Sequence, residues 1–281
     1  MKPNNIMRIG VCIFIVFTLL SISHALAGNN IVSQIRQFTV NNNYVPVVNN
    51  VTSIPAINPL AGNITFVYIN FTVSDRNGVG ILNDSSSRVV FNKSATQRLG
   101  SCTPNDINTT ATIYICNVSM WYFDDPGVWS INVSVRDNSS NVAYNDTTSF
   151  TYNTLSAIRL NLTGLSFGSI YIRQPTGATN DPIGINNTGN VDFTNISLRA
   201  FDLVGSTYSN YAIYANQFAA STTDLFIKVL QNNTFIQIPG ASLTHGATAV
   251  QNIFLWVNVT YDIKAQIYNS SVLGNWMIMV Q

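Results

Sequence analysis

The residues with the most obvious chemical use are asparagines that stand two positions before a serine or threonine. Such Asn-x-Ser/Thr sequons, with x other than Pro, accept N-linked glycans in exported chains. The 37 asparagines, multiplied by the share of Ser and Thr (52 of 281 residues), predict about 7 sequons by chance. The sequence holds sixteen, at Asn50, Asn63, Asn70, Asn83, Asn92, Asn108, Asn117, Asn132, Asn138, Asn145, Asn161, Asn186, Asn195, Asn232, Asn258 and Asn269.

A second interpretation of the sequons needs no glycan. A strand that alternates apolar and polar residues places Asn and Ser or Thr two apart on its polar face. This interpretation covers Asn70, Asn132, Asn161, Asn195 and Asn258. Asn is a poor strand former, however, and Thr would serve a polar strand face better. We therefore favour extensive glycosylation, which would supply the solubility that charge normally gives and would cover strand edges.

Cys102 and Cys116 lie 14 residues apart. In an exported chain two such cysteines are expected to form one disulfide. A structural zinc site would need two more ligands, and the single histidine after residue 27, His245, cannot supply both. We therefore expect no metal and no cofactor.

The residues typical of catalysis are few. His245 lies in a loop-like stretch without a nearby acid or nucleophile, so a Ser-His-Asp triad is not indicated. Asp124 and Asp125 are adjacent, but they precede Pro126-Gly127 and are better explained as a turn. No catalytic residue is predicted and we expect no enzyme. An Asp-based hydrolase, with two carboxylates facing each other in a cleft, is kept as an alternative.

Calcium binding is one further alternative. Oxygen ligands for Ca²⁺ could come from inter-strand turns. Asp75, Asn77, Asp137 and Asn138 lie in such turns, although these are also ordinary turn residues.

Sugar binding on exposed aromatic rings is another alternative. Trp129 is in phase with an apolar strand face and is expected in the core. Trp256 lies on the polar face of its strand, which makes it the better candidate for contact with sugars, beside Trp121 and Tyr122.

The composition excludes several classes of protein. Hydrophobic residues make up 46% and charged residues 9% of the chain, the formal net charge is +1, and Glu does not occur. A near-neutral chain lacks the electrostatic footprint of a nucleic-acid-binding protein. The lack of Glu and the scarcity of Lys argue against helix bundles and coiled coils, and the apolar content is too high for a disordered chain.

Residues 1–27 have the pattern of a signal peptide. Lys2 and Arg8 are followed by an apolar run from Ile9 to Leu20 and by Ala25-Leu26-Ala27, a small-x-small cleavage pattern. An uncleaved signal anchor is the rival interpretation. No second apolar run of about 18 residues follows, so we expect a secreted or cell-surface protein without a membrane span after signal cleavage.

Period-two alternation of apolar and polar residues predicts strands along most of the remaining chain, the clearest at residues 67–73, 129–136, 142–152, 195–200 and 255–262. Turn-forming clusters separate the predicted strands, at residues 58–62, 75–80, 124–127, 137–141, 187–190 and 239–240. The one helix allowed is residues 211–220. The pattern predicts an all-β chain of two tandem Ig-like antiparallel β-sandwich domains, residues 28–154 and 155–281, with the pairing of residues 28–44 left open.

Residues 124–139 resemble the closing half of a PKD-type or bacterial-type Ig-like repeat, in which a Pro-Gly turn leads into an aromatic and an alternating strand. Residues 73–78 resemble the turn after the second strand of such modules. The second half is similar to modules of secreted, Asn-rich archaeal surface proteins, which implies an early strand at residues 165–170 and a turn at 186–191. The single local cysteine pair departs from the Cys-Trp-Cys core of animal Ig domains.

Together these patterns predict a non-enzymatic secreted or cell-surface glycoprotein with a structural or adhesive role in the cell envelope. The expected partners are other envelope proteins or surface glycans, and the oligomeric state is open. The alternative is a carbohydrate-binding module that uses exposed aromatics such as Trp256. A structural module is expected to show an apolar patch or a free strand edge where its neighbour sits.

Overall fold

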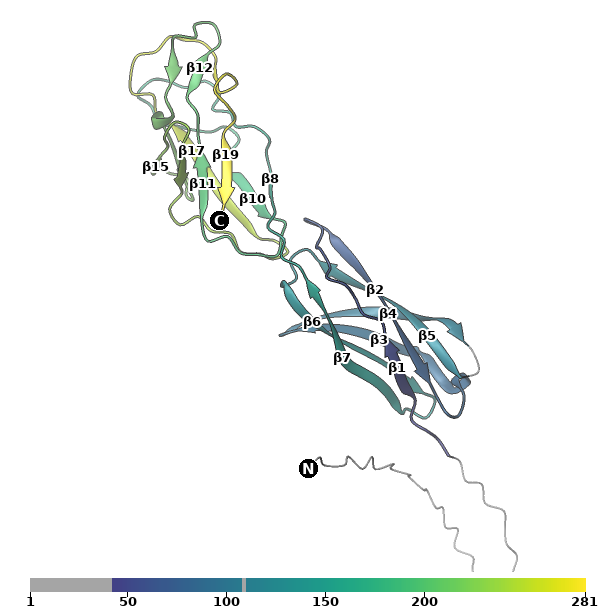
Figure 1. Ribbon diagram of the computed structural model, residues 1–281. Helices are drawn as coiled ribbons and strands as arrows, with labels where there is room; N and C mark the ends of the chain where they lie inside the picture. The colour runs from purple at the N-terminus through teal and green to yellow at the C-terminus, as the bar shows by residue number, and fades with distance from the viewer. Residues whose placement is uncertain (1–41, 108–109) are drawn as a thin grey trace, which may run out of the picture. The chain divides into compact units, whose positions relative to one another are not determined.

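The structure, a computed structural model, describes residues 42–107 and 110–281 (Figure 1). The predicted signal peptide (residues 1–27) and Asn108 lie outside these residues. Residues Asn43–Gln281 form one compact unit. The described chain is all-β and its sheets are antiparallel, as the alternation predicted.

The first seven strands form one sheet in the order β1-β2-β5-β4-β3-β6-β7. A short 3-10 helix, η1 (Val79–Ile81), precedes β3. The strands are β1 (Val47–Val51), β2 (Ile64–Ser74), β3 (Leu82–Lys93), β4 (Thr96–Ile107), β5 (Ala111–Trp121), β6 (Gly127–Asp137) and β7 (Val142–Tyr152).

Strict alternation explains why these segments form strands. In β2, β5 and β6 every second residue is buried, while the residues between are partly or fully exposed. Because successive side chains of a strand point to opposite faces, one face of each strand is apolar and must be covered. The predicted strands at residues 67–73, 129–136 and 142–152 are confirmed as β2, β6 and β7.

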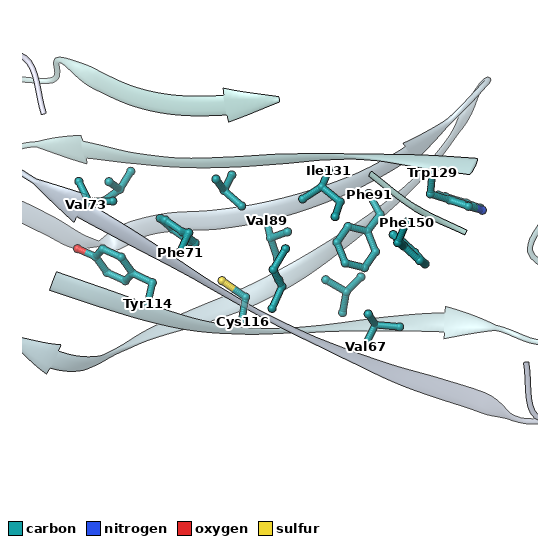
Figure 2. Close-up of a cluster of buried hydrophobic side chains, with 14 of the residues drawn as sticks. Val67, Phe71, Val73, Val89, Phe91, Tyr114, Cys116, Trp129, Ile131 and Phe150 are labelled. Carbon is teal, nitrogen blue, oxygen red and sulfur yellow. The ribbon is translucent and has the colours of Figure 1, made fainter. Parts of the chain in front are cut away.

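The buried faces enclose a continuous hydrophobic core (Figure 2). Trp129 is fully buried, as its phase predicted, and its indole N–H donates to the carbonyl of Asp125 at 3.0 Å. Gly100 of β4 faces this core, where an added Cβ would come within 2.6 Å of side-chain atoms of Val89 and Val118. The neighbouring strands therefore fill the space in front of β4 completely.

The sheet folds back until its two ends meet. Residues after β1 run beside β7, where the Ile57 amide donates to the Thr151 carbonyl and the Asn153 amide donates to the Ile57 carbonyl. This contact satisfies backbone groups that an edge strand would leave unpaired. The N-terminal core is thereby closed along this side.

The remaining strands form shorter sheets, with orders β15-β14-β17-β10-β8 (β9 also pairs with β17), β16-β11-β19 and β13-β12-β18. A second 3-10 helix, η2 (Ala215–Gln217), precedes β14. The strands are β8 (Ile158–Leu160), β9 (Thr176–Gly177), β10 (Ile183–Asn187), β11 (Ile196–Arg199), β12 (Leu203–Gly205), β13 (Ala212–Ile213), β14 (Phe218–Ser221), β15 (Lys228–Val229), β16 (Phe235–Gln237), β17 (Val250–Val257), β18 (Tyr268–Asn269) and β19 (Met277–Val280).

These sheets share a second hydrophobic cluster, separate from the first, with buried residues between Ile183 and Val259. The loop after β10 is tied down by buried amides. Asn190 accepts from the Leu155 amide at 2.6 Å and donates to the carbonyls of Asn153 and Asp124. Every polar atom of this carboxamide is therefore paired, as a buried polar group requires.

Three expectations for this second half are wrong or need adjusting. The predicted helix at residues 211–220 is replaced by β13, η2 and β14, because β14 is buried on both faces between β15 and β17. The early strand implied at residues 165–170 is not formed: Asn180 bonds to this stretch from its side chain, and Gly168 adopts a positive φ of 61°. The strand predicted at 255–262 ends at Val257.

The predicted disulfide between Cys102 and Cys116 is confirmed. The two cysteines face each other across β4 and β5, and Cys116 is fully buried in the first core. A bond that closes a loop of about 15 residues is worth roughly 3 kcal/mol because it restricts the unfolded chain.

We predict that the double variant Cys102→Ala/Cys116→Ala loses about 3 kcal/mol of unfolding free energy in denaturant titrations. The strands are already paired by backbone hydrogen bonds, so the far-UV circular dichroism should stay unchanged. An unfolding midpoint equal to that of the unaltered chain would contradict the prediction.

Candidate functional site

The acceptor asparagines of the described sequons all reach the surface. Of the fifteen, seven are exposed and eight are partly exposed, while the buried asparagines of the described chain, Asn187 and Asn190, are not in sequons. The exposed ones are Asn50, Asn63, Asn83, Asn117, Asn138, Asn161 and Asn232. The partly exposed ones are Asn70, Asn92, Asn132, Asn145, Asn186, Asn195, Asn258 and Asn269.

Three sequons share a local geometry in which the hydroxyl group contacts the acceptor carboxamide. Ser85 donates to Asn83 Oδ1 at 2.6 Å, Thr147 to Asn145 Oδ1 at 3.1 Å, and Ser271 to Asn269 Oδ1 at 2.5 Å. This arrangement is an Asx-type turn that leaves the amide nitrogen pointing away. These sequons can present Nδ2 without any rearrangement of the backbone.

Asn258 differs from the other acceptors. Its Oδ1 is buried and makes no hydrogen bond within the described chain. The hydroxyl of Thr260, the third residue of the sequon, donates to Gln217 Oε1 at 2.9 Å, and the Thr260 amide donates to the same oxygen. Both ends of this sequon are therefore held against the protein.

Trp256, the predicted sugar contact, is only partly exposed. Its ring covers Gly177 of β9, where an added Cβ would meet ring atoms at 3.8 Å, and its Nε1 is buried. Other aromatic rings are more open. Phe66 and Tyr68 of β2 are 56% and 65% exposed, and Trp121 of β5 is 39% exposed.

The surroundings of His245 contradict the expectation that no acid lies nearby. Its Nδ1 lies 2.7 Å from Asp192 Oδ1, and its Nε2 lies 2.9 Å from Asp125 Oδ1. Burial by itself would lower the pKa of His245, but the hydrogen bonds and charges of Asp192 and Asp125 raise it above the usual value. The backbone N–H of His245, followed by its ring, lowers the pKa of Asp192. Residues 120 apart thus form a carboxylate–imidazole–carboxylate bridge.

Asp124, the neighbour of this bridge in sequence, has a structural role. It is buried, accepts two hydrogen bonds of 3.0 Å from Arg98 Nε, and also contacts Arg98 Nη2. Its other partner is the Trp121 amide, at 2.7 Å. The ion pair holds the turn between β5 and β6, so the turn interpretation of Asp124 fits its position.

The turn residues considered for calcium cap their own turns. Asp75 accepts from the Asn77 amide at 2.7 Å. Burial raises the pKa of Asp137, yet hydrogen bonds from Asn141, Asn43 and the Ser139 amide outweigh it and lower that pKa. Within the described residues no group of three or more His, Cys, Asp or Glu side chains could hold a metal ion.

An open cleft with a volume of about 1090 Å³ lies in the second half. Its floor is the core between two sheets, where Ile183, Leu198, Phe218 and Val257 are all buried. We call this feature the C-terminal cleft. Its floor is therefore core surface, while its rim includes exposed residues such as Ile172 and Ile267.

Two sheet edges border the C-terminal cleft. Leu160 of β8 and Ile278 of β19 line it, and β8 and β19 are the outermost strands of their sheets (Figure 1). Among the described strands β19 pairs with β11 alone, and β8 pairs with β10 alone. Leu165 and Phe167, from the stretch expected to be a strand, also line the cleft. The resemblance therefore placed buried apolar residues at 165–170 correctly, although they do not form a strand.

Sequence reasoning missed the C-terminal cleft because its lining comes from nine strands and three loops that are far apart in the chain. No protein-family model matches this chain, and no curated protein matches it in sequence. The described residues contain no helix with the length and apolarity that a bilayer crossing requires.

The His245 bridge predicts a pH dependence of stability. A raised histidine pKa contributes stability that is present below the unfolded value of about 6.5 and is lost as pH rises through the folded value. A lowered Asp192 pKa contributes stability that is present above about 3.9 and is lost as pH falls through the folded value. Both contributions are therefore present between about pH 4 and 6.5.

We expect thermal unfolding to show a drop of roughly 2 °C in Tm as pH rises from 6 to 8.5. His245→Gln should remove this drop and leave a lower, flatter profile over the same interval. The matched control is Asp262→Asn, because Asp262 pairs with Arg173 and not with His245. An unaltered profile in His245→Gln would show that the bridge does not govern the pH response.

The buried geometry of Asn258 predicts that this sequon stays bare while the exposed ones carry sugar. The measurement is the mass of proteolytic peptides from the exported protein, before and after enzymatic glycan release. Release converts a modified Asn to Asp, so each acceptor is scored separately. Sugar on Asn258 would contradict the prediction, and bare asparagines at all fifteen sites would remove the argument for a glycoprotein.

Proposed function

We propose that this protein is a non-enzymatic, secreted glycoprotein with a structural role in the cell envelope, built from two Ig-like β-sandwich modules. Its copies associate head to tail. The N-terminal segment of each copy, residues 28–41, binds as an added strand in the C-terminal cleft of the next copy. The observation that carries the proposal is this cleft, which opens core surface between two free sheet edges.

An occupant of this cleft would remove apolar surface and unpaired strand edges from water, which is energetically favourable. Apolar surface left in water costs about 25 cal/mol per Å². Unpaired strand edges invite a further strand, whose backbone groups bond to the edge while alternate side chains enter the apolar space. A strand seated between β8 and β19 would meet both needs at once.

The strand edges beside the C-terminal cleft favour a peptide over a small molecule, because an extended peptide can pair with β8 or β19. The volume of about 1090 Å³ lies at the upper end of the range for small-ligand pockets, about 300–1,000 Å³. Most lining residues are apolar, and the polar ones are Thr163, Ser166, Ser169, Lys264, Gln266, Asn269, Ser270 and Asn275. An extended segment with apolar side chains on one side suits this surface.

The chain itself supplies such a segment. Residues 28–41 precede the first described strand and contain no Pro, and Val32, Phe38 and Val40 would share one face of an extended strand. Fully extended, these 14 residues span roughly 46 Å, longer than any strand of the described fold. Cleavage after Ala27 would free the end of this segment, which threading into a cleft requires. A heterologous contact of this kind produces open chains of subunits.

The surface asparagines fit the same role. A polymer in the envelope must stay soluble before assembly and must avoid pairing at the wrong edges. A glycan coat on a chain with 9% charged residues would provide both.

The test separates the two halves of the contact. Phe38→Asp disables the donated segment and Leu165→Asp disables the cleft, each in the full exported chain. We expect the unaltered chain to assemble and each variant alone to be monomeric by light scattering. An equal mixture of the two variants should give dimers and nothing larger. The intact segment of the Leu165→Asp variant can bind the intact cleft of the Phe38→Asp variant, but the complex then offers no further intact segment or cleft.

Two substitutions serve as controls for added charge. Gln37→Asp alters the same N-terminal segment at a polar position, and Leu225→Asp alters an exposed apolar residue that does not line the cleft. Both should assemble normally. A monomeric unaltered chain, or a cleft that binds an apolar small molecule with unit stoichiometry while Leu165→Asp leaves assembly intact, would overturn the proposal.

A further inference from the structure

An exposed tyrosine sits among acceptor asparagines on the outer face of the N-terminal sheet. In β2 the residues Phe66, Tyr68, Asn70 and Thr72 all lie on the face opposite the core, because Val67, Ile69, Phe71 and Val73 are buried. Tyr68 is 65% exposed. A bare aromatic ring of this size on a sheet face leaves apolar area in contact with water.

The neighbours of Asn70 leave one open direction for a sugar. On the β1 side, Thr52 bonds to both backbone groups of Asn70, and Asn50 lies opposite Thr72. On the β5 side, the cross-strand partner is Ile115, which is partly exposed. Along β2, Tyr68 is two residues away, roughly 7 Å along the strand. Tyr68 is 65% exposed, and its direct cross-strand partner on β5 is Asn117, an exposed sequon acceptor on the same face.

We propose that Tyr68 packs against the first sugar of a glycan on Asn70, so that this glycan stabilises the N-terminal sheet. The inference rests on the proposed glycosylation, and it identifies Tyr68 as the side chain that contacts the Asn70 glycan. The C–H face of a sugar ring is apolar and covers an aromatic ring in the same way that other apolar groups do. Phe66, two residues further along the same face, extends the covered surface.

The covalent step is a transfer from an activated donor. The anomeric carbon of a sugar carried on a lipid diphosphate bonds to Asn70 Nδ2. The bond from that carbon to the diphosphate breaks, the lipid diphosphate leaves with the electron pair, and Nδ2 gives one proton to water. The Asn70 carboxamide makes no hydrogen bond within the described chain, so Nδ2 is available for this step.

Two other sequons in the chain provide matched comparisons. Asn132 of β6 is partly exposed like Asn70, but the residue two positions before it is Ser130. Asn258 has Trp256 two positions before it and Thr260 two after it, the same pattern as at Asn70, but its Oδ1 is buried and Thr260 is bonded to Gln217. A glycan on Asn132 should add no packing, and Asn258 should carry none.

The experiment is a double-variant cycle in the exported, full-length chain. Tyr68→Ala, Asn70→Gln and the double variant are purified from the glycosylating host, peptide masses report occupancy at Asn70, and calorimetry reports Tm. Loss of the Asn70 glycan should lower Tm by about 3 °C when Tyr68 is present. In the Tyr68→Ala background the same loss should change Tm by less than about 1 °C. Asn132→Gln should remove a glycan without changing Tm.

The outcomes separate this inference from the proposed function. Equal Tm changes in both backgrounds, with Asn70 occupied, overturn the role of Tyr68 and leave the glycoprotein intact. A bare Asn70 in a chain that carries sugar elsewhere overturns the inference alone, whereas bare asparagines throughout overturn both. Asn117 is the direct register partner of Tyr68 on the neighbouring strand β5. A Tm loss that follows Asn117→Gln and not Asn70→Gln would show that Tyr68 packs against the Asn117 glycan, and would overturn the inference.

Discussion

The structure depends on one constraint: the apolar face of every strand must be covered, and the edges of the covering sheets must be closed. The N-terminal sheet meets this constraint within its own chain, since residues around Ile57 bond to β7 and join the two ends of the sheet. The described strands of the second half do not meet it. There β8 and β19 end their sheets, and the C-terminal cleft enters the core between them. The difference between the two halves is the physical basis for the proposed association.

A second theme is the use of amides in place of charge. With no Glu and few Lys residues, the polar strand faces are made from Asn, Ser and Thr. Burial decides what each amide does. Asn187 and Asn190 are buried, and their carboxamides tie loops together through several hydrogen bonds. The sequon asparagines remain at the surface. Among the described charged groups, Arg98 pairs with Asp124 and His245 bridges two acids.

Strands could be predicted from the sequence where one face is apolar and the other is polar. The strands β2, β6 and β7 follow directly from period-two alternation, because each must present one apolar face. At residues 218–221 the prediction failed, since a strand buried on both faces shows no alternation. At residues 165–170 the error was the reverse: a strand was expected there, and none forms. Their apolar residues are partly buried, but their backbone bonds go to loops and to Asn180.

The sequence by itself determined the all-β class, the main strands, the Cys102–Cys116 pair and the positions of the acceptor asparagines, because each depends on residue types at short and fixed spacing. Only the tertiary structure decided which acceptors are held against the protein, which acids reach His245, and where the core remains open. Those features join residues up to 120 positions apart. No local pattern encodes such distances, since the packing of the sheets alone sets which side chains meet.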